Sequence, residues 1–216
     1  MPLLQLFTSG NSTIGLWEIT ETEEELLSFT QLPEVLEEAA KLKNLVRRTE
    51  FLASRILVQE LQKHLNLPLE LPKKDENGCP CLHHCNYRIS LSHTTGMAAA
   101  IITTDKAAGI DLEPIREQIL KLAPKFLSEQ EQQQQVQNDA LKTTLYWSIK
   151  ETIYKLYSKK KLLFAQHMQV HDFEPDLKGG TAFATLRINE LNKTYRVGYQ
   201  LIKNLALTWS TATADD

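Results

Sequence analysis

Two short segments of the chain carry acidic and basic side chains at spacings that could support metal-assisted chemistry. In the first, Asp111 and Glu113 stand two residues apart in AGIDLEP, which is predicted to be extended, so both side chains point to one side of the strand. Two carboxylates facing one way repel each other unless water, a cation or a partner screens them. Mg2+ accepts hard oxygen ligands and is commonly held by one or two carboxylates together with substrate phosphates. The pair indicates either a magnesium site or a polar strand end before the turn at Pro114.

The second segment is WSIKETIYK, where Glu151 and Lys155 lie one turn apart on a predicted helix. They share a face with Trp147 and Tyr154, roughly opposite the apolar stripe of the same helix. A helix with a core stripe on one side and large aromatic residues on the other is covered on both sides, so we expect the pair to be partly buried or to line a cleft. The alternative is an ordinary exposed ion pair, which contributes only about 0.3–0.5 kcal/mol.

Hydrophobic periodicity predicts the elements that position these groups. Helical spacing of apolar residues predicts three helical regions, 34–65, 115–137 and 138–161. The third region has a core stripe of Leu141, Leu145, Ile149, Ile153 and Leu156. Apolar runs of strand length predict strands in YRISLSH, GMAAAIITT, AGIDLEP, TAFATLRI, TYRVGYQLI and LALTWST.

Each half of the chain therefore runs from helix to strands. We predict an α+β fold of two similar lobes, 1–105 and 106–216, each a long helix packed on a small antiparallel sheet. The second lobe carries both chemical segments.

Composition limits the kinds of partner. The chain has 216 residues, of which 24% are charged and 42% hydrophobic, as in ordinary globular proteins. The formal net charge of −3 lacks the basic excess that favours nucleic acid or an anionic membrane. The amino terminus lacks a basic start followed by an apolar core, and the longest apolar run, MAAAII, is too short to span a bilayer. We expect a cytoplasmic protein with no nucleic-acid or membrane partner.

Cysteines and histidines crowd into CPCLHHC, which raises the possibility of a small zinc-binding interaction module. Structural zinc sites usually offer two pairs of ligands, whereas this segment has a single C-x-C and no matching pair elsewhere. The spacing favours reduced thiols in a turn.

The combination of the two segments resembles the 4'-phosphopantetheinyl transferase superfamily. The family has a G-[IV]-D strand followed by W/F-[SC]-x-K-E-x-x-x-K, and this chain matches with GID at 109–111 and, about forty residues on, WSIKETIYK. Glu113, the chain length and Ser92-His93 in ISLSHTTG are similar to the larger, monomeric branch named for the surfactin-synthetase activator. In that branch one chain contains two pseudo-symmetric lobes, so the resemblance implies this fold and a monomer.

The resemblance also implies an activity of the holo-[acyl-carrier-protein] synthase type. Such an enzyme uses Mg2+ to transfer phosphopantetheine from coenzyme A to a serine of an apo acyl or peptidyl carrier protein, and it releases adenosine 3',5'-bisphosphate. A catalytically inactive relative that binds a nucleotide or a partner is the alternative.

The roles of individual residues follow from the resemblance by position. Asp111, Glu113 and Glu151 are expected to bind Mg2+, and Glu151 is also the expected general base. Lys155 is expected to neutralise the leaving group, which makes Asp111, Glu151 and Lys155 the catalytic set. The expected coenzyme A contacts are Ser92 and His93 at the 3'-phosphate, Lys150 at a phosphate, and Arg48 or Arg55, with Arg47 a further candidate.

Further positions depart from the family or are less well defined by it. Gly78-Cys79-Pro80 stands where relatives commonly have G-K-P, so a nucleotide-contacting lysine is absent unless Lys73 or Lys74 replaces it. Glu131 stands where the family often has another acid near the metal's waters. A locally basic surface is expected for an acidic carrier protein, with candidates Lys121, Lys125, Lys142 and 159–161.

Overall fold

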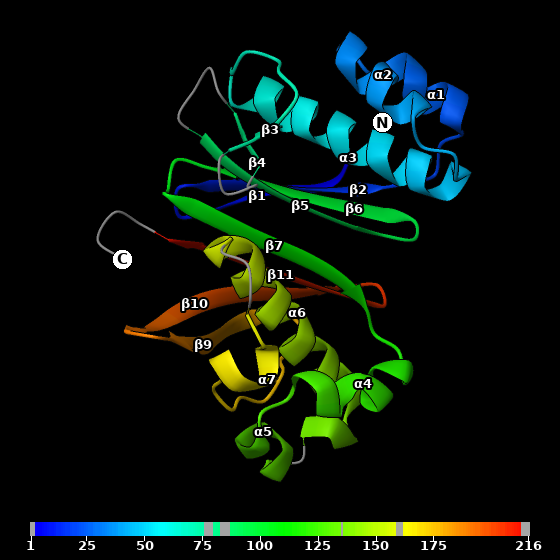
Figure 1. Cartoon of the computed structure of the whole chain (residues 1–216). Helices are drawn as coiled ribbons and strands as arrows, with labels where there is room; N and C mark the ends of the chain where they lie inside the picture. The colour runs from blue at the N-terminus through cyan, green and yellow to red at the C-terminus, as the bar shows by residue number, and fades with distance from the viewer. Residues whose placement is uncertain (1–2, 76–79, 83–86, 135, 159–161, 213–216) are drawn as a thin grey trace. The chain divides into compact units, whose positions relative to one another are not determined.

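The computed structural model describes residues 3–75, 80–82, 87–134, 136–158 and 162–212 (Figure 1). The chain divides into two compact units between Ala108 and Gly109, and each unit is described by itself. Both units are mixed α and β with an antiparallel sheet, so the predicted α+β class is confirmed. Among the described residues, none of the helices is long and apolar enough to cross a membrane.

The first unit packs a long helix on a six-stranded sheet. The strand order is β1-β2-β6-β5-β4-β3, with antiparallel pairing between neighbours. Its elements are β1 (Leu3–Ser9), β2 (Ser12–Glu18), α1 (Glu23–Phe29), α2 (Pro33–Ala40), α3 (Leu45–His64), β3 (Lys73–Lys74), β4 (Pro80–Leu82), β5 (Tyr87–Thr94) and β6 (Met97–Thr103).

The predicted helical region 34–65 is two helices rather than one. Helix α2 has its C-cap at Lys41, and α3 begins after Asn44, whose Oδ1 accepts the Arg47 N–H at 3.0 Å. An asparagine that caps a helix N-terminus marks a new start because it satisfies a backbone donor that has no partner inside the helix. The β1–β2 hairpin was not predicted from the sequence.

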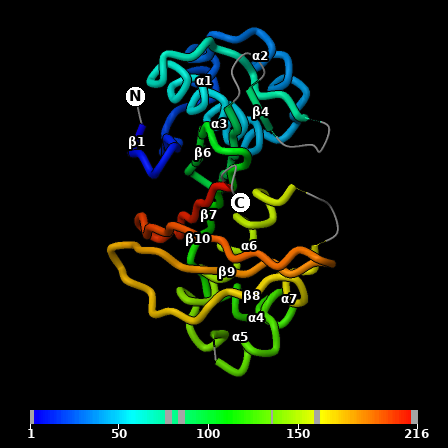
Figure 2. The backbone as a smooth tube through the Cα atoms, turned by 90° about the vertical axis from the view of Figure 1, so that its left-hand side faces the viewer, coloured from blue at the N-terminus to red at the C-terminus, as the bar shows by residue number. Residues whose placement is uncertain are grey.

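The second unit packs helix α6 on a five-stranded sheet of order β7-β11-β10-β9-β8. Strands β8, β9 and β10 lie side by side in Figure 2. Its elements are β7 (Ala107–Pro114), α4 (Gln118–Phe126), α5 (Glu129–Gln133), the 3₁₀ helix η1 (Val136–Asn138), α6 (Ala140–Tyr157), α7 (Phe164–His167), β8 (Met168–Val170), β9 (Gly180–Ile188), β10 (Leu191–Ile202) and β11 (Leu205–Ala212).

The predicted helical region 115–137 is also divided. Helix α4 ends at Phe126, and Ser128 then starts α5 through a capping box with Glu131. In that box the Ser128 Oγ accepts the Glu131 N–H at 3.2 Å, and the Glu131 carboxylate accepts the Ser128 N–H at 2.6 Å. The break positions Glu131 inside the unit instead of on a continuous helix face.

Helix α6 forms where the periodicity predicts it. Asp139 caps its start by accepting the Leu141 and Lys142 N–H groups at 2.7 and 3.1 Å, and Ser158 ends it in the left-handed region at φ 59°. The stripe residues from Leu145 onward are buried, and Leu141 is half-buried. One face of the helix thus packs in the core, and another carries Glu151 and Lys155.

Gly109 sets how closely β7 approaches α6. A Cβ at this position would lie 2.0 Å from the Thr152 carbonyl oxygen and 3.2 Å from the Leu156 Cβ, which no larger residue tolerates without moving the backbone. Because strand side chains alternate, the next residue on the same face of β7 is Asp111. The glycine therefore brings a carboxylate within bonding distance of the helix.

Candidate active site

Asp111 is held from two sides by side chains of α6. Its Oδ1 accepts a hydrogen bond from the Lys155 Nζ at 2.8 Å, and its Oδ2 accepts one from the Ser148 Oγ at 2.9 Å. Lys155 also donates to the Ile110 carbonyl oxygen at 2.9 Å. Asp111 is 3% exposed and Lys155 is half-buried, so the pair is a partly desolvated ion pair and not a surface one.

A chain of buried hydroxyl groups ends on Asp111. The Ser148 Oγ lies 2.8 Å from the Thr208 Oγ1, which lies 2.6 Å from the Thr152 Oγ1. The ionised carboxylate can only accept, so the single proton of Ser148 points to Asp111. The Ser148 oxygen therefore accepts from the Thr208 hydroxyl, and the Thr208 oxygen accepts from the Thr152 hydroxyl. The two threonine hydroxyls also reach the carbonyl oxygens of Ser148 and Thr208, at 3.0 and 3.3 Å, so Ser148 is the hydroxyl of this chain that donates to the carboxylate and helps to fix its position.

Glu113 lies on the same face of β7 as Asp111, as predicted. Its Oε1 accepts a hydrogen bond from the Trp147 Nε1 at 3.0 Å. Burial and the nearby Asp111 charge raise the pKa of Glu113, and the Trp147 bond opposes this shift. Trp147 therefore joins the carboxylates to the aromatic side of α6.

Glu151 is half-buried and faces the same charges. Burial, followed by the charge of Asp111, raises the pKa of Glu151 to about 7, although Lys155 acts in the opposite direction. A carboxylate with a pKa near neutral exchanges protons readily at physiological pH. The three acids and Lys155 form one electrostatic cluster, defined here as the carboxylate cluster.

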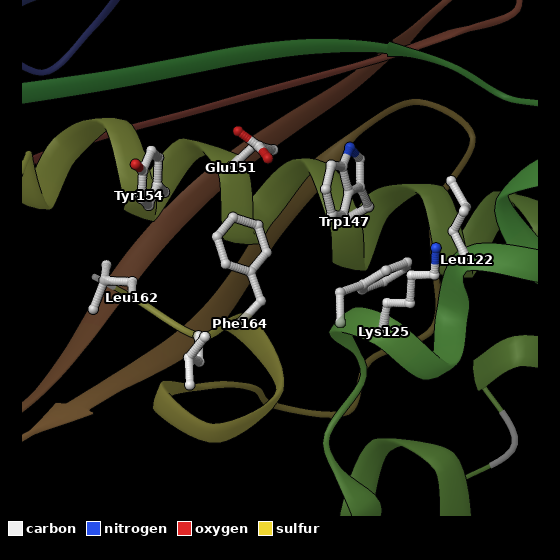
Figure 3. Close-up of a pocket in the computed structure, with 9 residues that line it drawn as sticks. Leu122, Lys125, Trp147, Glu151, Tyr154, Leu162 and Phe164 are labelled. Carbon is white, nitrogen blue, oxygen red and sulfur yellow. The ribbon is translucent and has the colours of Figure 1, made fainter. Parts of the chain in front are cut away.

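A pocket of about 590 Å3 opens beside Glu151 (Figure 3). Its aromatic wall runs from Phe126 to Trp147 to Phe164 to Tyr154, with ring centroids 5.0, 5.4 and 5.7 Å apart in turn. Figure 3 shows Trp147, Glu151 and Tyr154 along α6, with Phe164 and Leu162 opposite. The other lining residues are Leu122, Lys125 and Leu163. The pocket is mainly apolar, with an acid at one side.

Lys150 and Glu131 do not join the carboxylate cluster. Both are fully buried, and the Lys150 Nζ donates to Glu131 Oε2 at 2.6 Å and to the Phe126 carbonyl oxygen at 2.8 Å. Burial lowers the pKa of Lys150, and Glu131 opposes the shift. The resemblance implied Lys150 at a phosphate and Glu131 near metal-bound water, but both side chains are 0% exposed and present no surface to a ligand.

The other expected contacts lie in the first unit. Ser92 is buried at the end of β5, and the half-exposed His93 Nδ1 lies 3.2 Å from the Glu50 Oε2. Arg48 pairs with Glu23 and donates to the Leu42 carbonyl oxygen at 2.8 Å. These contacts hold Arg48 between α3 and the preceding helices.

Arg55 and the remaining basic candidates differ in exposure. The Arg55 guanidinium stacks 4.4 Å from the Phe51 ring, and burial lowers its pKa. Lys142 is not a free surface cation, because it is buried and paired with Asp172 and Glu174 at 2.8 and 3.0 Å. The exposed candidates are Arg47, Lys73, Lys74, Lys121 and Lys125. Cys79 and 159–161 lie outside the described residues.

The donor chemistry of the carboxylate cluster fits Mg2+. Burial and then the charges of Asp111 and Glu113 raise the pKa of Glu151, and a divalent cation would relieve the repulsion among the three carboxylates. Within the described part of the chain, no three His, Cys, Asp or Glu side chains are gathered closely enough to hold a metal ion by themselves. The arrangement fits an open site of one or two carboxylates completed by water and phosphate. Of CPCLHHC, the described residues include Cys81, a buried thiol.

The second unit is an α+β domain with a carboxylate and lysine cluster beside an apolar pocket, a combination suited to the transfer of a phosphate-bearing group. Residues 107–209 match the family described as the 4'-phosphopantetheinyl transferase superfamily, and residues 36–103 match its N-terminal domain. The chain belongs to the 4'-phosphopantetheinyl transferase superfamily, which confirms the resemblance and makes it a transferase. The search of curated proteins returned no match.

Thr152 and Thr208 were not predicted from the sequence. Ser148 and Thr152 are one helical turn apart on a buried face, which is a weak signal for a polar seam. Thr208 is 60 residues from Ser148 in the sequence, so their contact had no local signal.

Proposed function

We propose that this protein transfers the 4'-phosphopantetheine group of coenzyme A to a serine of an apo acyl or peptidyl carrier protein. The observation that supports the proposal is the carboxylate cluster, in which Asp111, Glu113 and Glu151 interact electrostatically beside Lys155. The family match gives the transfer class, and the cluster supplies groups for the individual steps.

Glu151 is the proposed general base. In the reaction the serine oxygen forms a bond to the β-phosphorus of coenzyme A while the bond from that phosphorus to the bridging oxygen breaks. The serine proton passes to Glu151, directly or through water, and adenosine 3',5'-bisphosphate leaves. The pKa of about 7 belongs to Glu151 without a cation, and bound Mg2+ would lower it, which favours proton transfer through water.

Lys155 and a cation held among the three acids are proposed to offset the negative charge of the phosphates. Lys155 donates three hydrogen bonds at most, two of which go to Asp111 and Ile110, so it can offer another to a phosphate oxygen. One or two of the carboxylates of Asp111, Glu113 and Glu151 would hold Mg2+, with water and phosphate as the other ligands. When bound, that ion offsets the charge that develops on the leaving group.

The apolar pocket beside Glu151 is proposed to receive the pantetheine arm. That arm is uncharged and elongated, which suits an aromatic wall better than water does. In the first unit, His93 remains the proposed contact for the 3'-phosphate. Its ring is half-exposed, and the Glu50 Oε2 at 3.2 Å from Nδ1 orients it.

The test is transfer to an apo carrier protein. We expect the protein with coenzyme A and Mg2+ to add the mass of phosphopantetheine to the carrier serine, measured by mass spectrometry. Glu151→Ala and Asp111→Ala should abolish the adduct, whereas Glu129→Gln, which alters an exposed acid of α5, should leave it intact. The reaction should stop when EDTA removes the metal.

Several outcomes would overturn the proposal. If folded protein leaves apo carriers of the fatty-acid, polyketide and peptide-synthesis types unmodified, the chain is a non-catalytic relative. If Glu151→Ala transfers at the wild-type rate, the assigned base is wrong. The proposal also includes a cytoplasmic monomer, and light scattering of the purified protein tests the monomer.

A further inference from the structure

Lys150 stands next to the proposed base Glu151 in the sequence but points into the core. Successive helix residues are separated by about 100° around the axis, so neighbours can face different surroundings. The Lys150 Nζ donates to the Phe126 carbonyl oxygen at 2.8 Å, and it lies 3.5 Å from the Phe164 carbonyl oxygen. The side chains of these two phenylalanines are part of the pocket wall. One ammonium group therefore contacts the backbone of two residues whose side chains form part of the aromatic wall.

The backbone groups at these positions need such a partner. Phe126 is the last residue of α4, and the last carbonyl groups of a helix lack donors within it. A lysine that reaches a helix C-terminal carbonyl satisfies the oxygen and complements its partial negative charge. Lys150 thus ties the end of α4 to the middle of α6.

Glu131 completes the arrangement from the other side. Its Oε2 accepts from Lys150 at 2.6 Å and from the Ser128 N–H at 2.6 Å, and its Oε1 accepts the Val170 N–H at 2.8 Å. The carboxylate therefore connects the start of α5 and strand β8 to the same ammonium group. Both side chains are fully buried and joined to four separate segments, which indicates a structural connection.

We propose that Lys150, together with Glu131, is a positioning residue that fixes Phe126 and Phe164 in the aromatic wall of the pocket beside Glu151 and does not contact a phosphate. The choice of coenzyme A as the pocket's ligand rests on the proposed function. The connection of Lys150 to Phe126 and Phe164 rests on geometry alone, so it can be tested separately from the proposed function.

The first measurement does not depend on any ligand. Trp147 lies between Phe126 and Phe164, so its fluorescence reports the wall. We expect Lys150→Met to shift the emission to longer wavelength as water reaches the indole, and the same change in a Trp147→Phe background to give no shift. Lys178→Met removes an exposed lysine of the same unit and should have no effect.

The second measurement separates the wall from the phosphates. Adenosine 3'-phosphate 5'-diphosphate carries all three phosphates of coenzyme A without the pantetheine arm, so calorimetry should give it nearly the same Kd with Lys150→Met as with wild type. Coenzyme A should bind about tenfold more weakly to the variant, since apolar contact is lost in the pocket. Glu131→Gln should reproduce both results, because the two side chains act as one pair.

The proposal is overturned if Lys150→Met weakens both ligands equally while Glu131→Gln weakens neither, because Lys150 would then be a phosphate ligand. It is also overturned if the Trp147 emission stays unchanged in both variants. If Lys150→Met does not fold, Glu131→Gln, which keeps one acceptor oxygen, decides between these outcomes. If wild-type protein binds neither ligand, the proposed function fails, and the fluorescence result still decides the positioning role.

Discussion

Two lysines of one motif on α6 lie in different surroundings. Lys150 sits in a closed region formed by α4, α5, α7 and β8, where it and Glu131 are both fully buried and bonded to backbone groups. Lys155 sits where β7 meets α6, half-exposed, with its partner Asp111 close to two further acids. Around Lys150 the charges are balanced by protein groups. Around Lys155 an excess of negative charge remains, which a bound cation could neutralise. A charged pair with both partners buried indicates a structural role. A half-exposed lysine among several acids, where the charges do not balance, indicates a site for a ligand or a reaction.

The largest effect should come from breaking the closed pair. Lys150→Met leaves the Glu131 carboxylate buried without its cation, and we expect a loss of about 3–5 kcal/mol in the free energy of unfolding. Urea unfolding followed by circular dichroism measures it. Exposed Lys178→Met is the matched control, and a loss as small as that of the control would show that the pair is not internal.

Replacing Lys155 should affect activity more than stability. Lys155→Met should lower kcat for carrier modification by about 10²–10³-fold, since a group that stabilises developing charge is lost. Its effect on unfolding should be smaller than that of Lys150→Met, because Lys155 is half-exposed. Steady-state kinetics and the same urea titration check both parts. Equal losses of stability would remove the distinction between the two lysines.

Gly109→Ala tests how the open region is built. The added Cβ would meet the Thr152 carbonyl oxygen at 2.0 Å, so β7 and α6 must separate. We expect a destabilisation of about 1–3 kcal/mol and reduced transfer activity. Gly96→Ala, at a turn where no atom lies within 4 Å of the added carbon, is a control for glycine replacement, although its positive φ adds local strain. Unchanged activity in a folded Gly109→Ala protein would contradict the close-approach argument.

Thr208→Val should produce a smaller change in the same region. The substitution keeps the shape but removes the donor to the Ser148 Oγ, which costs about 0.5–1.5 kcal/mol of stability. It should weaken binding of Mn2+, measured by electron paramagnetic resonance as a probe of the carboxylates. Thr181→Val, at an exposed position on β9, is the matched control. Wild-type Mn2+ affinity in Thr208→Val would show that the hydroxyl chain does not position Asp111.

The smallest effect is a pH dependence away from both regions. Lys142 lowers the pKa of Asp172 through a hydrogen bond, so this pair stabilises the fold above the unfolded-state pKa of Asp172 and loses that contribution as the pH falls through the folded-state value. The raised pKa of Lys142 makes the contribution disappear again in strong alkali. The difference in stability between wild type and Lys142→Met should thus be greatest near neutral pH and vanish at both extremes. A difference that is constant with pH would contradict an electrostatic origin.

Much of the fold was predictable because its signals are local. The stripe on α6 and the apolar runs of β5, β6, β7, β9, β10 and β11 follow periods that belong to the chain itself. The breaks were harder to predict. Asn44 and Ser128 are capping residues, but their role appears only when the neighbouring backbone turns away, so two predicted helical regions ran on too far.

The sequence by itself determined the family and the residues that share a face: Asp111 with Glu113 on a strand, and Glu151 with Lys155 on a helix. Backbone periodicity sets those relations before any packing occurs. Only the tertiary structure decided that Lys150 is enclosed, that Gly109 brings the strand against the helix, and that Thr208 completes a chain of donors to Asp111. Burial and hydrogen-bond partners depend on elements far apart in the sequence. Two lysines with the same local pattern can therefore have different roles.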